Sequence, residues 1–255
     1  AGVLGSLRGL ERPMVCEVGA GWAGFAYQLR TLLPGTRYVI GEFAGLFLFS
    51  ATYLGTLFPD ARMVFCGTAE TPTVADAGDA DFIFVPHTMA SQVSSLPLDL
   101  TVNMVSFQEM TDRQVRAYAD MAADAGCPWL YRFNRDRSPF NTQITSVTEA
   151  LADRYQLTEV SVLPTDYTTV LKKPPKAGKN VERSEFNYRH LAGRIAPSAR
   201  LRASRSGETS ARPGAGGSAA GPPVVLGMTL YNKASHLREA LDSLLAQTFG
   251  DFRLV

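Results

Sequence analysis

A glycine-rich turn that follows an acidic residue is the segment of this chain with the clearest chemical meaning. Glu17 stands near the end of an apolar run that starts at Met14. Three glycines follow at a G-x-G-x-x-G spacing, ahead of an apolar helical pattern: Gly19, Gly21 and Gly24. Glycine has no Cβ, so it accepts the dihedrals of a tight turn and lets a ligand reach the backbone. The order predicts a strand, a turn and a helix, the nucleoside-binding corner of an open α/β sheet, although a βα turn without a ligand can carry the same glycines.

Two classes of cofactor use such a corner: nicotinamide or flavin dinucleotides, and S-adenosylmethionine. The second expected strand, 38–41, ends at Glu42, whose carboxylate can accept both ribose hydroxyls of either cofactor. Glu17 distinguishes the two classes of cofactor. A carboxylate at the mouth of the loop repels the pyrophosphate of a dinucleotide and attracts the ammonium and sulfonium groups of S-adenosylmethionine. We therefore expect S-adenosylmethionine. Its expected binding residues are Glu17, Gly19, Gly21, Gly24 and Glu42.

Composition and charge describe an ordinary globular protein with a basic tail. The 255 residues are 45% hydrophobic and 19% charged, with a formal net charge of +1. Lys and Arg are concentrated in residues 172–205, so the remainder is acidic. The odd set Cys16, Cys66 and Cys127 has no C-x-x-C spacing, which argues against disulfides and zinc and fits a reducing cytosol. No apolar run is long enough to span a membrane. We therefore expect a cytoplasmic protein with no metal.

Apolar runs alternate between strand and helix patterns over residues 14–173, which predicts a mostly parallel sheet with helices on both faces. Thr111 and Gln114 form a predicted capping box at the start of one helix. The expected strands are 14–18, 38–41, 63–66, 82–85, 98–105, 129–133, 157–163 and 167–172, and the expected helices are 22–33, 43–57, 111–125 and 142–155.

The last two expected strands are separated by only three residues. Parallel neighbours need a crossover of a dozen residues or more, so 157–163 and 167–172 should form an antiparallel hairpin. A parallel sheet that ends in such a hairpin is the Rossmann-like arrangement of class I S-adenosylmethionine-dependent methyltransferases. The predicted fold class is therefore α/β of that kind.

The chain divides into three predicted parts. Residues 1–175 form the methyltransferase domain, 176–223 a basic, disordered linker rich in Gly, Ala, Arg, Pro and Ser, and 224–255 an ordered segment. The linker arginines could touch nucleic acid or anionic lipid, but a solvated tether is the preferred interpretation, so we expect no nucleic-acid partner. The chain starts without Met and stops within an apparent strand, so both ends look cut.

Two resemblances extend this interpretation. Cys16–Gly24, Tyr38–Glu42, Trp129–Asn134 and above all Asn103–Met110 resemble the bacterial putative sugar O-methyltransferases, over roughly residues 10–175. One departure is Glu42, where that family has Asp. The strand, turn and helix pattern of 224–255 resembles the start of a family-two glycosyltransferase of the GT-A fold, without its metal-binding acidic pair or its catalytic base.

The first resemblance implies methyl transfer to a hydroxyl of a sugar or glycan acceptor. A base that removes the hydroxyl proton during attack accelerates such a step. Glu109 is the first candidate for this base and His87 the second, with Asn103 as a positioning group in catalysis. The expected substrate-binding residues are Ser106, Gln108 and Asn134. The alternative for each polar residue of the 103–109 run is a loop or helix-capping role.

Two other functions remain open. A nicotinamide-dependent oxidoreductase fits the glycines and Glu42 but not Glu17 or the terminal hairpin. A non-catalytic module that tethers a glycosyltransferase fits the linker and leaves Gln108 and Glu109 unexplained.

Overall fold

The computed structural model describes residues 3–138, 140–160, 188–197, 224–226 and 252–254. Contacts divide the chain into two compact units, Ala1–Thr209 and Ser210–Val255.

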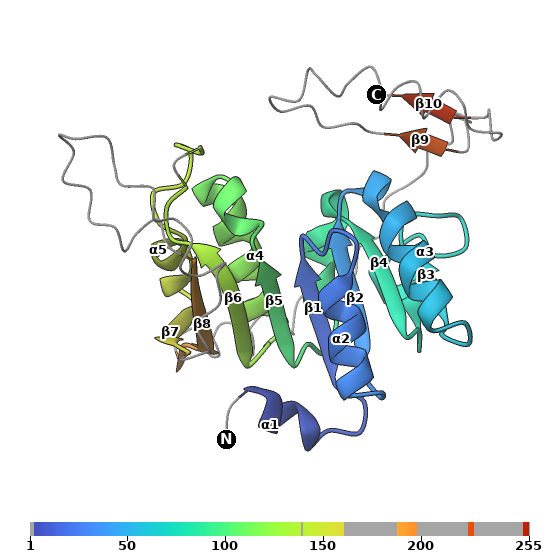
Figure 1. Cartoon of the computed structure of the whole chain (residues 1–255), viewed down its shortest axis with the longest axis horizontal. Coiled ribbons are helices and arrows are strands. Elements are labelled where there is room, and N and C mark those ends of the chain that lie inside the picture. The colour runs from blue at the N-terminus through green and yellow to red at the C-terminus, as the bar shows by residue number, and fades with distance from the viewer. Residues whose placement is uncertain (1–2, 139, 161–187, 198–223, 227–251, 255) are drawn as a thin grey trace, which may run out of the picture. The chain divides into compact units, whose positions relative to one another are not determined.

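Within the described part of the first unit, eight strands form one sheet in the order β3-β4-β2-β1-β5-β6-β8-β7 (Figure 1). The first six strands run parallel to their neighbours, so their carboxyl ends share one edge. The predicted α/β fold class is confirmed. The bounds are β1 (Met14–Val18), β2 (Arg37–Glu42), β3 (Met63–Phe65), β4 (Phe82–Pro86), β5 (Leu100–Met104), β6 (Trp129–Arg135), β7 (Tyr155–Glu159) and β8 (Tyr188–Ile195).

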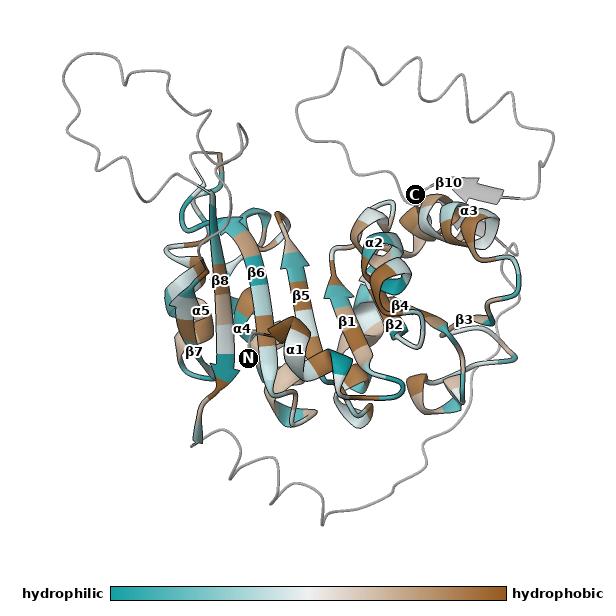
Figure 2. Cartoon of the chain, turned by 60° about the horizontal axis from the view of Figure 1, so that its bottom comes forward, coloured by the Kyte–Doolittle hydropathy of each residue, from teal (hydrophilic) through white to brown (hydrophobic). Residues whose placement is uncertain are grey.

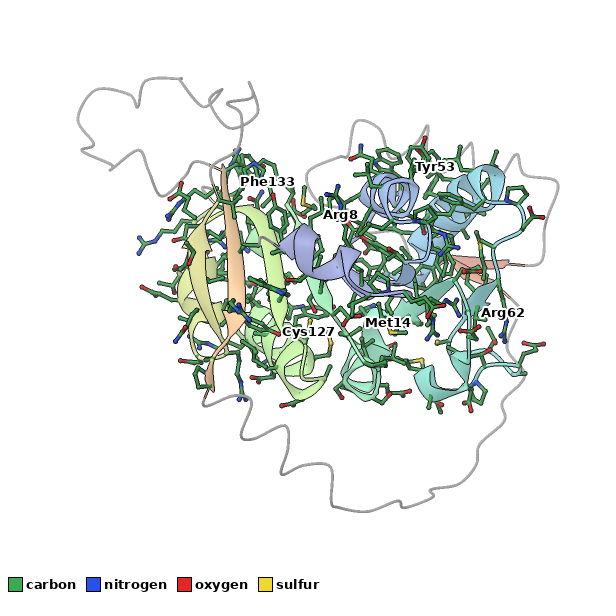
Figure 3. All side chains as sticks on the ribbon, turned by 90° about the horizontal axis from the view of Figure 1, so that it is seen from below. Arg8, Met14, Tyr53, Arg62, Cys127 and Phe133 are labelled. Carbon is green, nitrogen blue, oxygen red and sulfur yellow. The ribbon has the colours of Figure 1, made fainter. Side chains whose placement is uncertain are left out.

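Helices cover both faces of this sheet. α1 (Val3–Arg8), α2 (Gly24–Leu32) and α3 (Phe47–Leu57) pack on one face, and α4 (Asp112–Asp124) and α5 (Val147–Ala152) on the other. Figure 3 accordingly has Arg8 and Tyr53 on one side of the sheet and Cys127 on the other. The central strands β1 and β4 are almost wholly buried, because helices cover both faces of the sheet there. In Figure 2 the strands show brown hydrophobic residues interspersed with white and teal ones.

Local signals set the helix starts. Thr111 caps α4: its Oγ1 accepts a hydrogen bond from the Gln114 backbone N–H, and the Gln114 side chain accepts one from the Thr111 N–H, which confirms the predicted capping box. α5 begins later than the predicted 142, because Ser146 acts as its N-cap and accepts a hydrogen bond from the Glu149 N–H.

The far end of the sheet differs from the predicted hairpin. β8 lies between β6 and β7 and is antiparallel to both. It comes from residues 188–195, which the sequence assigned to the linker, and this part of the assignment is wrong. Composition misled it, because the segment is basic overall while Leu191 and Ile195 alternate inward to the core. The predicted strand 167–172 lies outside the described residues.

In the second unit, β9 (Val224–Leu226) and β10 (Phe252–Leu254) form a parallel pair. Strands were predicted at both places. The helix expected within 224–255 and most of the predicted linker lie outside the described residues. No helix in the described part of the chain is long and apolar enough to cross a membrane.

Candidate functional site

The three glycines of the loop after β1 have different surroundings. Gly19 has a φ of +72°, and a Cβ built on it would clash with Ser106 Oγ, so this glycine permits close packing of β1 against the β5 loop. A Cβ on Gly24 would clash with the Trp22 ring. Gly21 has a φ of +56° and no atom within 4 Å of an added Cβ. Gly21 is therefore the loop glycine that faces open space.

Glu42 at the end of β2 reaches across to this loop. Its Oε2 accepts a hydrogen bond of 2.9 Å from the Gly21 backbone N–H, and its Oε1 accepts one of 2.8 Å from the Phe43 N–H. A carboxylate offers about four acceptor positions, so two remain for a ligand. Phe43 beside it is 49% exposed. The geometry presents a carboxylate and an aromatic ring at the carboxyl edge of the sheet.

Glu17 lies below the loop, not at its mouth. The side chain is buried, and its Oε2 accepts a hydrogen bond of 2.8 Å from the Tyr38 hydroxyl of β2. Burial is the main cause that raises the pKa of Glu17; the Tyr38 hydrogen bond lowers it and the charge of Glu42 raises it, and the result is a pKa of about 8. The sequence predicted an ionised group at the mouth of the loop, and the structure replaces it with a buried group that holds its proton near neutral pH.

Asn103 at the end of β5 joins three segments of the chain. Its Nδ2 donates to the Val18 carbonyl oxygen at 2.8 Å and to Ser106 Oγ at 2.5 Å. Its Oδ1 accepts from the Phe107 N–H at 3.0 Å and from Asn134 Nδ2 at 2.8 Å. Asn103 is fully buried, and its amide has no donor or acceptor left over. Asn103 and Ser106 therefore fix the loop between β5 and α4.

The side-chain hydrogen bonds of Asn103 enclose Val105, whose backbone is strained. Val105 has a φ of +75°, an uncommon conformation for a β-branched side chain, which costs on the order of 1–3 kcal/mol. Asn103 precedes Val105 and bonds Ser106 and Phe107, which follow it. The network holds the turn that carries Gln108 and Glu109.

Gln108 and Asn134 are buried, and both serve the sheet edge. Gln108 Oε1 accepts a hydrogen bond of 2.8 Å from the Arg135 N–H, and its Nε2 donates to the Tyr188 hydroxyl at 3.1 Å. Asn134 contacts Asn103, and its own Oδ1 is buried without a hydrogen-bond partner among the described residues. Gln108 thus connects the turn after β5 to the ends of β6 and β8.

Glu109 and His87 are exposed at the same edge. Glu109 ends the short 3-10 helix Phe107–Glu109, and partial burial together with the charge of Glu42 raises its pKa. His87 follows β4, and its ring centroid lies 4.6 Å from that of Phe43. The structure therefore brings Glu42, Glu109 and His87 to one edge, with Asn103, Ser106 and Asn134 beneath them.

The electrostatic character of this edge is acidic. Burial is the main cause of the raised pKa of Glu17 and of Glu109, and the charge of Glu42 adds to both shifts, so the three carboxyl groups interact. Within the described ranges, no group of three or more His, Cys, Asp or Glu side chains could hold a metal ion. The part of the edge around Glu42 and Glu109 suits a ligand with positive charge.

A hollow of about 310 Å³ lies elsewhere, between Arg30, Asp81 and the segment after α3. Arg30 and Asp81 form an ion pair of 2.8 Å there, at the amino end of β4. This hollow is at the opposite edge of the sheet from the glycine loop.

Comparison with known proteins gives only distant matches to this chain. No protein-family model matches the chain, and no curated protein sequence does. Among solved structures, the pyocyanin biosynthetic protein PhzM aligns at 11% identity and a TM-score of 0.44, over 72% of this chain and 50% of that one. Human N-acetylserotonin methyltransferase, in complex with S-adenosylmethionine, aligns at 12% identity and 0.36, over 71% and 47%. The chain thus spans about half the length of these two proteins.

The magnesium protoporphyrin IX methyltransferase ChlM from Synechocystis PCC 6803, with bound S-adenosylmethionine, aligns at 9% identity and a TM-score of 0.46, over 76% of this chain and 74% of that one. The strand order, with β8 antiparallel between β6 and β7, is that of a Rossmann-like α/β sheet.

Sequence reasoning missed three residues at this edge: Phe43, Arg135 and Tyr188. Phe43 directly follows Glu42, and its place after a strand end was a usable signal. Arg135 extends β6 beyond the predicted end at residue 133. Tyr188 belongs to β8, and no local pattern marked that strand.

Proposed function

We propose that the chain is an S-adenosylmethionine-dependent methyltransferase that acts on a hydroxyl of a sugar or glycan. The observation that carries the donor assignment is Glu42, which bonds the Gly21 N–H while Gly21 faces open space. A ribose placed against this loop can donate both hydroxyls to the remaining acceptor positions of Glu42. The exposed Phe43 ring next to Glu42 offers a flat apolar surface to the adenine.

Charge favours this donor over a dinucleotide. A pyrophosphate near Glu42 and Glu109 would meet two carboxylates, whereas a sulfonium and an ammonium are attracted by them. Partial burial is the main cause of the raised pKa of Glu109, and the negative charge of Glu42 adds to it. The residues present therefore fit S-adenosylmethionine, and a nicotinamide-dependent oxidoreductase is the second candidate.

Different residues have different roles in the proposed methyl transfer. The bound donor supplies an electrophilic methyl group on a positively charged sulfur. Glu109 accepts the proton of the acceptor hydroxyl as the oxygen attacks, because its carboxylate is exposed at the carboxyl edge and its raised pKa makes it a stronger base. Asn103 is a positioning residue, which holds the Val105 turn and so the place of Glu109. His87 is the alternative base.

The sugar acceptor rests on the resemblance of Asn103–Met110 and its companion segments to sugar O-methyltransferases. The fusion to a glycosyltransferase rests on residues 224–255, of which β9 and β10 are the described part. We propose that the complete protein both methylates and extends glycans, and that residues 224–255 catalyse no glycosyl transfer by themselves.

Calorimetric titration tests the donor assignment. We expect S-adenosylhomocysteine to bind and NAD to bind at least tenfold more weakly. Glu42→Gln keeps the shape of the side chain and removes its charge, so it should weaken S-adenosylhomocysteine binding by about 10- to 100-fold. Glu70→Gln, at an exposed position after β3, which β4 and β2 separate from β1, is the matched control and should bind normally.

Other outcomes of this titration separate the alternatives. Tighter binding of NAD than of S-adenosylhomocysteine would identify an oxidoreductase. Binding of neither would leave the non-catalytic module as the function. An unchanged affinity in Glu42→Gln would remove Glu42 from the donor site.

A further inference from the structure

Arg135 is a cation without a counter-ion at the carboxyl end of β6. No carboxylate of the described residues forms an ion pair with it, and its Nε is buried without a hydrogen-bond partner in that part of the chain. Other arginines nearby are paired: Arg132 with Asp136 at 2.9 Å and Arg189 with Glu159 at 2.9 Å. Arg135 therefore keeps donors that the fold does not use.

The guanidinium of Arg135 is held in a fixed place. Its Cζ lies 4.7 Å from the centroid of the Tyr188 ring, which pairs with it across β6 and β8. The Tyr188 ring stacks on Phe133 at 5.1 Å, and Phe133 stacks on His190 at 4.2 Å. Phe133 lies on the same side of the sheet as Arg8 in Figure 3. A guanidinium fixed on an aromatic ring loses little freedom when it binds a planar anion.

This cluster adjoins the proposed base. Gln108 Oε1 accepts a hydrogen bond from the backbone N–H of Arg135, and Gln108 Nε2 donates one to the Tyr188 hydroxyl. Glu109 is the next residue in the chain. The donor side of the edge carries Glu42, so the carboxyl edge is negative on the donor side and positive at Arg135. An acceptor molecule that lies across it meets Glu109 at its hydroxyl and Arg135 at a second point.

We propose that the acceptor carries an anionic group, a carboxylate or a phosphate next to the sugar ring, which binds the guanidinium of Arg135. This inference rests on the proposed methyl transfer and names the substrate class of the same site. The two N–H donors along one edge of a guanidinium match the two oxygens of either anion. The hydroxyls of a neutral sugar can accept from these donors but cannot balance the charge of the guanidinium, so an acidic saccharide or a sugar phosphate fits Arg135 better.

Direct binding tests the proposal without the methyl-transfer reaction. The full chain is titrated with glucuronate, glucose 1-phosphate and glucose, with S-adenosylhomocysteine present, and followed by NMR. We expect both anionic sugars to bind about 10- to 100-fold more tightly than glucose. Tighter binding of glucuronate than of glucose 1-phosphate would indicate a carboxylate acceptor, and the reverse would indicate a phosphate acceptor.

Arg194 provides a matched control variant. Its guanidinium lies 4.5 Å from the centroid of Trp129, in the same cross-strand geometry at the other end of β6 and β8. Arg135→Gln should abolish the preference for anionic sugars, Arg135→Lys should keep part of it, and Arg194→Gln should leave it intact. The ratio of anionic to neutral affinity is the readout, since a purely structural effect would lower both.

Several outcomes would overturn the proposal. These are equal affinity for glucose and the anionic sugars, no binding of any of the three, a preference that survives Arg135→Gln, or an equal loss in Arg194→Gln. A wrong donor assignment would give a different result, because S-adenosylhomocysteine would then not bind. The preference for anionic sugars could still be measured in the absence of S-adenosylhomocysteine.

Discussion

At the residue scale, Gly21 has a close structural counterpart in Gly126. Gly21 has a φ of +56° and Gly126 one of +69°, and neither has an atom within 4 Å of an added Cβ. Gly21→Ala and Gly126→Ala should therefore lose similar stability, on the order of 1–2 kcal/mol, from backbone strain. The donor site needs the space above Gly21, so this variant alone should lose S-adenosylhomocysteine binding.

Thermal unfolding and calorimetric titration of both variants measure these two effects. Equal binding by the two variants would show that the loop glycine does not face the donor.

Glu109→Gln tests the proposed base. The variant keeps the shape of the side chain and cannot accept the proton, so kcat should fall roughly 10²- to 10⁴-fold while S-adenosylhomocysteine affinity stays within a few fold. The pKa of Glu109 is raised by partial burial and by Glu42, so wild-type kcat should fall as pH decreases through a value above that of an ordinary glutamate. Full turnover in Glu109→Gln and a loss in His87→Asn would transfer the role to His87.

The raised pKa of Glu17 should make the free energy of unfolding depend on pH. Its pKa is raised from 4.5 to about 8, first by burial, so the folded chain holds a proton in this interval that the unfolded chain releases. The free energy of unfolding should therefore fall as pH rises from 4.5 toward 8, by about 1.4 kcal/mol for each pKa unit of difference between the two states. Glu17→Gln stays neutral and still accepts from Tyr38, so its decline should be shallower.

Urea unfolding of wild type and Glu17→Gln between pH 5 and pH 8 measures this difference, with Glu70→Gln as the exposed control. Parallel curves for wild type and Glu17→Gln would mean that Glu17 is ionised in the folded chain.

At the scale of elements, β8 belongs to the folded sheet of the first unit and packs against β7. A Cβ on Gly193 would lie 2.9 Å from Leu157 Cδ2 and 3.0 Å from Tyr155 Cβ, because β8 packs tightly against β7. Gly193→Val should therefore lower the free energy of unfolding by about 1–3 kcal/mol. Ala192→Val, one residue earlier and on the other face of β8, should lower it by less.

Chemical unfolding of both variants gives the comparison. If neither substitution changed stability, residues 188–195 would behave as the linker that composition suggested. A chain cut at residue 175 would lack β8 and should lose cooperative unfolding for the same reason.

At the scale of the whole molecule, the proposed site belongs to one unit. All the candidate donor and acceptor residues lie within Ala1–Thr209. Removal of Ser210–Val255 should therefore leave the unfolding temperature of this unit and its affinity for S-adenosylhomocysteine unchanged. Calorimetry of the shortened chain checks both, and a clear loss of either would show that the second unit supports the site.

The sequence by itself determined the features that depend on neighbouring residues. The strands from Met14 to Arg135, the glycine turn and the Thr111 capping box follow from periodicity, backbone dihedrals and side chains within one helical turn. The tertiary structure decided the rest, because it depends on contacts between distant segments. Pairing with β6 and β7 made β8 a strand, burial against Tyr38 made Glu17 a neutral group, and the meeting of Arg135 with Tyr188 created the proposed anion site.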